Sequence, residues 1–212
     1  MLPLTLLTVL APLTATQADD PVTVPADAAT AAVTPAIDEV VTEAAGPSWS
    51  YVQVAAGTTT FEVLGTDIDL DTVDVKAGAQ VSDTVYLHAT YQESDFTLGG
   101  KATGLKIGAG LRAPLSPTVD LFAQGSYVSA EAETINAETD GWGVDAGIRA
   151  MVAPRLELGA SVQYVDDGTL DSTTYEGHAY FNVVGGLALA AEYLTDPDAD
   201  QSTTLFGLRY SF

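Results

Sequence analysis

The two histidines of this chain are its side chains best suited to proton transfer, because an unperturbed imidazole titrates near neutral pH. His178 follows Glu176 by two residues, and a hairpin would bring Ser161 of the preceding segment beside them. A hydroxyl, an imidazole and a carboxylate are the components of acyl-transfer catalysis. However, no nucleophile motif surrounds Ser161, which stands in GASVQ. We predict no catalytic residue and no metal site, and we expect His88 and His178 to be hydrogen-bonded interior side chains.

A larger set of charged residues occupies the polar positions of segments in which apolar and polar residues alternate. The set comprises Asp74, Lys76, Lys106, Arg112, Asp120, Asp145, Arg149, Glu157, Glu176, Glu192 and Arg209. If these side chains share an interior, they must pair, because an isolated buried charge is costly. Two interpretations stay open: an ion-pair network that stiffens the interior, or the lining of a narrow hydrated path whose selectivity these charges set.

Polar, mostly acidic segments separate several of these alternating stretches. They read ESDFTLGGKA, SAEAETINAETDG, DDGTLDST and TDPDADQST. One interpretation is a solvated surface that keeps the ends of the stretches in water. The other is divalent cations that bridge carboxylates to anionic lipopolysaccharide, since Ca²⁺ prefers carboxylate oxygens. DPDAD lacks the glycine and the final glutamate of an EF-hand loop, so the sequence itself indicates no built calcium site.

Composition excludes several classes of protein. The formal net charge of −22 argues against a nucleic-acid partner, because such binding depends on Lys and Arg neutralising phosphates. Hydrophobic residues make up 47% of the chain, which is too many for a wholly disordered protein. There is no cysteine, so disulfides and thiolate metal sites are unavailable. No motif calls for a cofactor, and we predict none.

The first 47 residues differ from the rest. Residues 1–18 form an apolar stretch that ends in small residues, and we interpret it as a signal peptide cut after Ala18, although no Lys or Arg precedes its apolar core. Residues 19–47 are rich in Ala, Thr, Pro and Asp and contain no aromatic residue. Such a segment buries too little apolar surface to offset its ordering entropy, so we predict a flexible acidic tether.

From residue 48 to 212, ten segments alternate with period two, which is typical of β-strands. The first carries Val52, Val54 and Ala56 on one face, and the last ends in Phe206, Leu208, Tyr210 and Phe212. Each segment has about the ~9–11 residues that a tilted strand needs to cross a bilayer. Alternation alone does not separate a soluble β-sandwich, with its apolar face inside, from a membrane barrel, with its apolar face toward lipid.

Three features favour the barrel. Short breaks (SD, APLSP, AP, GG) alternate with long ones, as short periplasmic turns alternate with external loops in outer-membrane barrels. Aromatic residues lie near the ends of the apolar faces, as in interfacial girdles: Tyr91, Tyr127, Trp142, Tyr164, Tyr175 and Tyr193. Glycines recur on the polar face, where we expect them to make room for Arg and Lys side chains. We predict an all-β, antiparallel, transmembrane up-and-down β-barrel of ten strands, with eight as the alternative.

A last strand that ends Tyr210-x-Phe212 resembles the C-terminal signature of bacterial outer-membrane β-barrels, which their assembly machinery reads. The resemblance covers residues 48–212 and points to the small OmpA-like, OmpX-like and opacity-type barrels. It implies the outer membrane of a Gram-negative bacterium, both barrel termini in the periplasm, and the barrel assembly machinery, outer-membrane lipid and lipopolysaccharide as partners. The signature is specific for location and says little about activity. We expect a structural or surface-interaction role in the envelope. The alternatives are a narrow, cation-favouring porin-like channel and an outer-membrane lipid hydrolase or protease.

Overall fold

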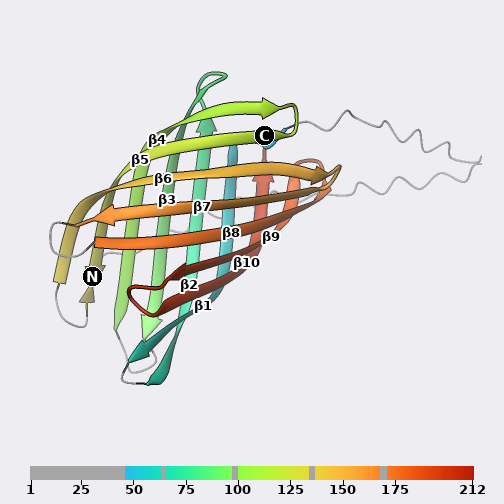
Figure 1. Cartoon of the computed structure of the whole chain (residues 1–212). Helices are drawn as coiled ribbons and strands as arrows, with labels where there is room; N and C mark the ends of the chain where they lie inside the picture. Colours follow the sequence, from blue (N-terminus) through green and yellow to red (C-terminus); the bar gives the residue numbers. More distant parts are fainter. Residues whose placement is uncertain (1–45, 64, 97–99, 134–136, 168–170) are drawn as a thin grey trace, which may run out of the picture. The chain divides into compact units, whose positions relative to one another are not determined.

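The computed structural model describes residues 46–63, 65–96, 100–133, 137–167 and 171–212, which form ten antiparallel strands closed into a barrel (Figure 1). The strands are β1 (Tyr51–Val63), β2 (Thr66–Gln80), β3 (Val85–Phe96), β4 (Lys101–Ser116), β5 (Val119–Ala132), β6 (Ala137–Ala153), β7 (Leu156–Asp166), β8 (Asp171–Val184), β9 (Leu187–Asp196) and β10 (Gln201–Ser211). The prediction of ten strands is confirmed, and the eight-strand alternative is wrong. The described residues contain no helix long and apolar enough to span a membrane. The predicted signal peptide and nearly all of the tether lie outside the described residues.

The last strand closes the barrel against the first. β1 pairs with β10 from Tyr51, opposite Ser211, to Phe61, opposite Gln201. The backbone N–H of Phe212 donates to the carbonyl of Ser50 at 3.1 Å and extends the pairing to the final residue. Every strand therefore has two neighbours, and no row of unpaired backbone groups faces the hydrocarbon of a bilayer.

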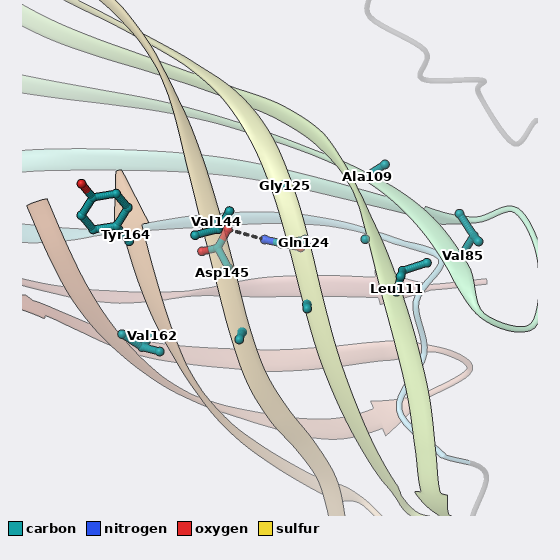
Figure 2. A pocket seen from close by; sticks show the side chains of 12 residues that line it. Val85, Ala109, Leu111, Gln124, Gly125, Val144, Asp145, Val162 and Tyr164 are labelled. Atoms are coloured by element: carbon teal, nitrogen blue, oxygen red, sulfur yellow. Dashed lines mark hydrogen bonds between the residues drawn. The ribbon is translucent and has the colours of Figure 1, made fainter. Parts of the chain in front are cut away.

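Adjacent residues on each strand face opposite sides of the barrel wall, and the apolar side is the outer one. On β1, Val52 and Val54 are exposed, whereas Gln53 and Ala55 are buried in the lumen. Figure 2 shows the same alternation on β6, where Val144 lies on the outer face and Asp145 accepts a 2.9 Å hydrogen bond from the Gln124 side chain. A soluble β-protein has its apolar side chains inside and its polar side chains outside. The opposite arrangement seen here is typical of a barrel in lipid.

The six aromatic residues of the predicted girdle lie on segments near one end of the barrel. We call this the hairpin end, because β1–β2, β3–β4, β5–β6, β7–β8 and β9–β10 are joined there. The opposite end, where β1 begins and β10 stops, is the terminus end. There β8 and β9 are joined by Gly185 and Gly186, whose φ angles of 54° and 84° fit a two-residue type I′ turn.

The prediction of long loops at the hairpin end is wrong. β3 continues to Phe96 and β4 begins at Lys101, so the acidic ESDFTLGGKA segment is mostly paired strand. The other three acidic segments are shortened in the same way, and the longest strand, β6, reaches 17 residues. Polar residues on both faces indicate that a segment lies in water, but they do not indicate whether the segment is a loop or a strand. Cross-strand hydrogen bonds hold the ladder together there just as they do within the bilayer.

Small residues on the outer face of β3–β7 leave a shallow apolar hollow of about 560 Å³ (Figure 2). Its lining includes the small residues Ala109, Gly125 and Ala146 and the larger Leu111 and Tyr164. The hollow lies on the apolar outer surface, and its charged and amide neighbours, Asp145 and Gln124, are bonded to one another. It is a feature of the lipid-facing wall and carries no polar chemistry of its own.

Candidate functional site

Trp49, which precedes β1, lies buried inside the lumen at the terminus end. Its indole N–H donates a 2.7 Å hydrogen bond to Asp120 Oδ2 on β5. Its ring lies 4.3 Å from the ring of Tyr86 and 5.5 Å from that of Phe122. Trp49 is only 3% exposed, as are Tyr86 and Arg209. These buried side chains therefore occupy part of the lumen at this end.

Two buried arginines donate hydrogen bonds to the backbone next to Trp49. The carbonyl oxygen of Ser48 accepts hydrogen bonds from Arg149 Nη2 at 2.9 Å and from Arg209 Nη2 at 2.8 Å. The Arg149 guanidinium lies 4.3 Å from the centre of the Trp49 ring, and the Arg209 guanidinium lies 3.5 Å from that of Tyr51. Such cation–π contacts are strongest where water is excluded. We call Trp49, Tyr51, Tyr86, Phe122 and Tyr180, with Arg149 and Arg209, the aromatic plug.

The Arg149 charge is balanced by Glu157. Arg149 Nε donates to Glu157 Oε1 at 2.7 Å, and Nη2 lies at the same distance from that oxygen. On the other side of the plug, Asp120 receives the Trp49 hydrogen bond and lies 3.4 Å from Arg112 Nε. Arg149 and Glu157 are both buried, so the attraction between them offsets part of the cost of removing each charge from water.

Glu192 is the centre of a second group of polar side chains. Its carboxylate accepts hydrogen bonds from Lys76 Nζ at 2.7 Å, from Gln53 Nε2 at 2.8 Å and from Tyr180 OH at 2.7 Å. Lys76 also lies 3.6 Å from Glu176. Lys76 belongs to β2 and Glu192 to β9, so this group joins strands that are three places apart around the barrel.

The remaining charged residues of the predicted set also face the lumen. Lys106 Nζ lies 3.6 Å from Asp145 Oδ1, while Asp145 Oδ2 accepts the bond from Gln124. Asp74 lines the lumen without a hydrogen bond to its Oδ1. The structure thus brings Arg149 with Glu157, Arg112 with Asp120, Lys76 with Glu192 and Glu176, and Lys106 with Asp145. Within the described residues, Asp74 belongs to none of these ion pairs.

The two histidines lie in separate surroundings inside the barrel. His88 Nε2 is 3.5 Å from Ser126 Oγ on β5. His178 stacks on Tyr180, with ring centres 4.7 Å apart, and its nitrogens lie 3.8 Å from Glu157 and 3.6 Å from Glu176. These distances are too long for hydrogen bonds, and both His178 nitrogens lack a hydrogen-bond partner within the described residues.

The Ser/His/Glu grouping considered from the sequence is only partly assembled. Ser161 on β7 stands directly opposite Glu176 on β8, whereas His178 stands opposite Gly159. No hydrogen bond joins Ser161 to His178 in the part of the chain that the structure describes. A general base must reach its nucleophile's proton. The described geometry therefore contains the three residue types without the nucleophile–base contact.

Several interior glycines lie against ring side chains and not against Arg or Lys side chains. A Cβ atom at Gly159 would collide with the His178 imidazole, and one at Gly110 would collide with the Tyr86 ring. Our expectation that these glycines accommodate basic side chains is wrong. The reason is that rings from the neighbouring strands lie nearest these glycines, whereas Lys76 and Arg149 extend toward carboxylates on other strands.

A polar chamber of about 230 Å³ occupies the lumen on the hairpin side of Lys76 and Lys106. Its wall carries hydroxyl and amide groups, including those of Thr90, Gln92 and Gln163. A second cavity, of about 80 Å³, lies among the side chains of the aromatic plug and the neighbouring charges. The lumen thus narrows from the hairpin end to the filled terminus end.

Tyr210 and Phe212, the residues of the C-terminal signature, lie on the outer face at the terminus end. Both are exposed, and their rings are 6.4 Å apart in a stacked arrangement. At the hairpin end, outward-facing polar side chains pair along the surface: Lys101 with Glu93, and the Tyr127 hydroxyl with Asp140. These pairs lie beyond the apolar belt, where an outer-membrane barrel meets water.

The model of the outer membrane protein β-barrel domain family matches residues 26–212 of this chain. The chain belongs to that family. The match begins within the predicted tether and includes all ten strands. A comparison with curated protein sequences finds no match.

Solved structures resemble the barrel at low sequence identity. The KdgM porin in complex with disordered oligogalacturonate shares 8% identity, covering 76% of this chain and 99% of that one, with a TM-score of 0.47. Neisserial surface protein A shares 16% identity over 78% and 98%, with a TM-score of 0.39. The N-terminal β-barrel domain of Pseudomonas aeruginosa OprF shares 13% over 78% and 100%, also at 0.39.

Sequence reasoning missed the most consequential lumen residue, Trp49. The available signal was its parity, because Trp49 and Tyr51 alternate with the outward-facing Val52 and Val54 and so share the lumen positions of Gln53 and Ala55. Nothing in the sequence indicated that the chain before β1 turns inward and not away from the barrel.

Proposed function

We propose that this protein is an integral barrel of the Gram-negative outer membrane that does not conduct and that has a structural or surface-interaction role in the envelope. The observation that supports this most directly is the aromatic plug. Trp49 crosses from the segment before β1 to Asp120 on β5, and Arg149 and Arg209 hold the adjacent Ser48 carbonyl. A barrel of this size is only slightly wider than one that side chains fill completely.

The alternative of a narrow, cation-favouring channel needs a continuous hydrated path. The chamber on the hairpin side satisfies that need over part of the length of the lumen. At the terminus end, however, Trp49, Arg149 and Glu157 are 3%, 4% and 5% exposed, and each has a hydrogen-bond partner. Opening a path requires breaking buried, charge-assisted hydrogen bonds, which are among the stronger ones in proteins. This weighs against the channel.

In this proposal the terminus end faces the periplasm and the hairpin end faces the exterior. The C-terminal Tyr210 and Phe212 then stand where the barrel assembly machinery reads them. The apolar outer face contacts membrane lipid, and the acidic hairpin end meets the lipopolysaccharide layer. Carboxylates such as Asp198 and Asp200 are exposed there. Divalent cations between these carboxylates and anionic lipid groups would be the contact that this arrangement favours.

Solute efflux from vesicles tests the proposal. The folded protein, identified by its heat-modifiable mobility on a gel, is inserted into vesicles loaded with potassium ions and a small neutral sugar. We expect no efflux above that of protein-free vesicles, whereas an open porin inserted at the same density empties them. Rapid potassium efflux that scales with the amount of folded barrel would contradict the proposal and favour the channel.

A further inference from the structure

The chamber on the hairpin side of the lumen contains a buried carboxylate with one oxygen, Asp74 Oδ1, that has no hydrogen-bond partner within the described residues. Asp74 on β2 is 3% exposed and lines the chamber. Its Oδ1 has no hydrogen-bond partner, and within the described residues the carboxylate forms no ion pair. A buried, unpaired acceptor carries its full desolvation cost, so such a group calls for an explanation.

Both lysines of the chamber already have carboxylate partners. Lys76 is bonded to Glu192 at 2.7 Å and lies 3.6 Å from Glu176, and Lys106 lies 3.6 Å from Asp145. Neither Glu192 nor Asp145 lines the chamber. The carboxylates that do line it are Asp74, Glu176 and Asp196. The chamber is therefore in excess of negative charge, even though lysines stand in its wall.

The rest of the lining fits an organic ion better than a metal ion. Hydroxyl and amide groups of Thr90, Gln92 and Gln163 offer hydrogen-bond acceptors, while Val128 and Leu194 offer apolar contact. Within the described residues, no group of three or more His, Asp or Glu side chains is arranged to hold a metal. The chamber volume of about 230 Å³ exceeds that of several water molecules at about 30 Å³ each.

We propose that this chamber binds a small organic cation through its ammonium group, with the Asp74 carboxylate as the principal acceptor. The ammonium N–H groups donate to Asp74 Oδ1 and to neighbouring hydroxyl and amide oxygens. The carbon part of the ion lies against the apolar residues. The acidic hairpin end and the net charge of −22 raise the local concentration of cations at the chamber's side of the barrel.

The test uses propylammonium chloride and the full-length barrel in a non-ionic detergent, with isothermal titration calorimetry as the readout. We expect saturable binding of one ion per barrel. Asp74→Asn keeps the shape of the side chain and removes its charge, and we expect it to weaken binding about tenfold or more, as the loss of a charge-assisted hydrogen bond does. Tetramethylammonium, which is cationic but has no N–H donor, should bind at least about tenfold more weakly than propylammonium.

The matched control is Asp67→Asn, which makes the same change of charge at an exposed position of β2 outside the chamber. It should leave the affinity within about twofold of that of the unaltered protein. Unchanged affinity in Asp74→Asn, equal affinity for the two probes, or no saturable binding to the unaltered barrel would each overturn the proposal.

A second measurement does not depend on a variant. The Asp74 carboxyl carbon of the unaltered protein, observed by ¹³C NMR, should shift in proportion to the occupancy found by calorimetry. A resonance that stays constant while propylammonium binds would locate the ligand elsewhere and overturn the assignment. Neither readout depends on whether the barrel conducts, so the inference and the proposed function fail separately.

Discussion

The indole N–H of Trp49 donates a 2.7 Å hydrogen bond to Asp120, which ties the segment before β1 to β5 across the lumen. In the ring of ten strands, β5 lies four places from β1 in one direction and six in the other. The bond therefore spans the barrel rather than joining neighbours. Together with the Ser48 carbonyl held by Arg149 and Arg209, it makes Ser48 and Trp49 part of the barrel's core.

Trp49→Ala should destabilise the barrel by about 3–5 kcal/mol, the cost typical of removing a large buried aromatic side chain. The substitution leaves a cavity among Tyr86, Phe122 and Arg149 and removes the hydrogen bond to Asp120. Urea-induced unfolding in lipid vesicles, followed by far-UV circular dichroism, measures the change. Trp142→Ala is the matched control, because that indole is half-exposed on the outer face. Equal losses in the two variants would contradict the role given to Trp49.

Glu157→Gln should destabilise the barrel by about 3–5 kcal/mol, because it leaves the Arg149 guanidinium buried with no carboxylate partner. The Ser48 carbonyl still accepts a hydrogen bond from Arg149 in this variant, but it does not balance the positive charge because it is neutral. The same unfolding experiment measures the effect. Glu138→Gln, at an exposed position of β6, provides the control and should leave the unfolding midpoint where it is. A neutral outcome for Glu157→Gln would mean that the arginine is hydrated in the lumen.

Val144→Arg tests which face of the wall meets lipid. Val144 is exposed on the outer face of β6, between strands whose outward residues are also apolar. An arginine facing lipid near the midplane of the bilayer should cost about 2–4 kcal/mol. Val144→Leu should be close to neutral. Unchanged stability of the arginine variant in lipid would show that this face is in water.

Single cysteines test the orientation of the barrel, since the natural chain has none. Ala199→Cys stands at the hairpin end and Arg155→Cys in the turn between β6 and β7 at the terminus end, and both positions are exposed. A membrane-impermeant maleimide added to intact cells should label the first and spare the second until the outer membrane is permeabilised. The reverse pattern would place the termini outside.

The alternation of side chains was readable from the sequence because each strand crosses one apolar layer. Val52, Val54 and the residues like them had to share a face, and the charges of the other face had to meet inside. The strand count followed from the same pattern. Where β3 ends and β4 begins was not readable, because beyond the apolar layer both faces become polar and the period-two signal disappears.

The contacts that fill the lumen were out of reach for a different reason. Parity places Glu192 and Lys76 inside, but their bond depends on the tilt of strands that are three places apart. Similarly, the isolation of Asp74 is visible only once every neighbouring cation has been assigned to another carboxylate. Sequence patterns constrain neighbours on one strand far better than partners across a barrel.

Single-channel recording in a planar bilayer tests the closed lumen most directly. The folded, heat-modifiable barrel is inserted at low density, and the current is followed across a range of voltages. The aromatic plug predicts that the unaltered protein gives no current steps. In Trp49→Gly, we expect small steps of ionic current. Discrete steps from the unaltered protein, with the same conductance in Trp49→Gly, would show that the plug does not close the lumen.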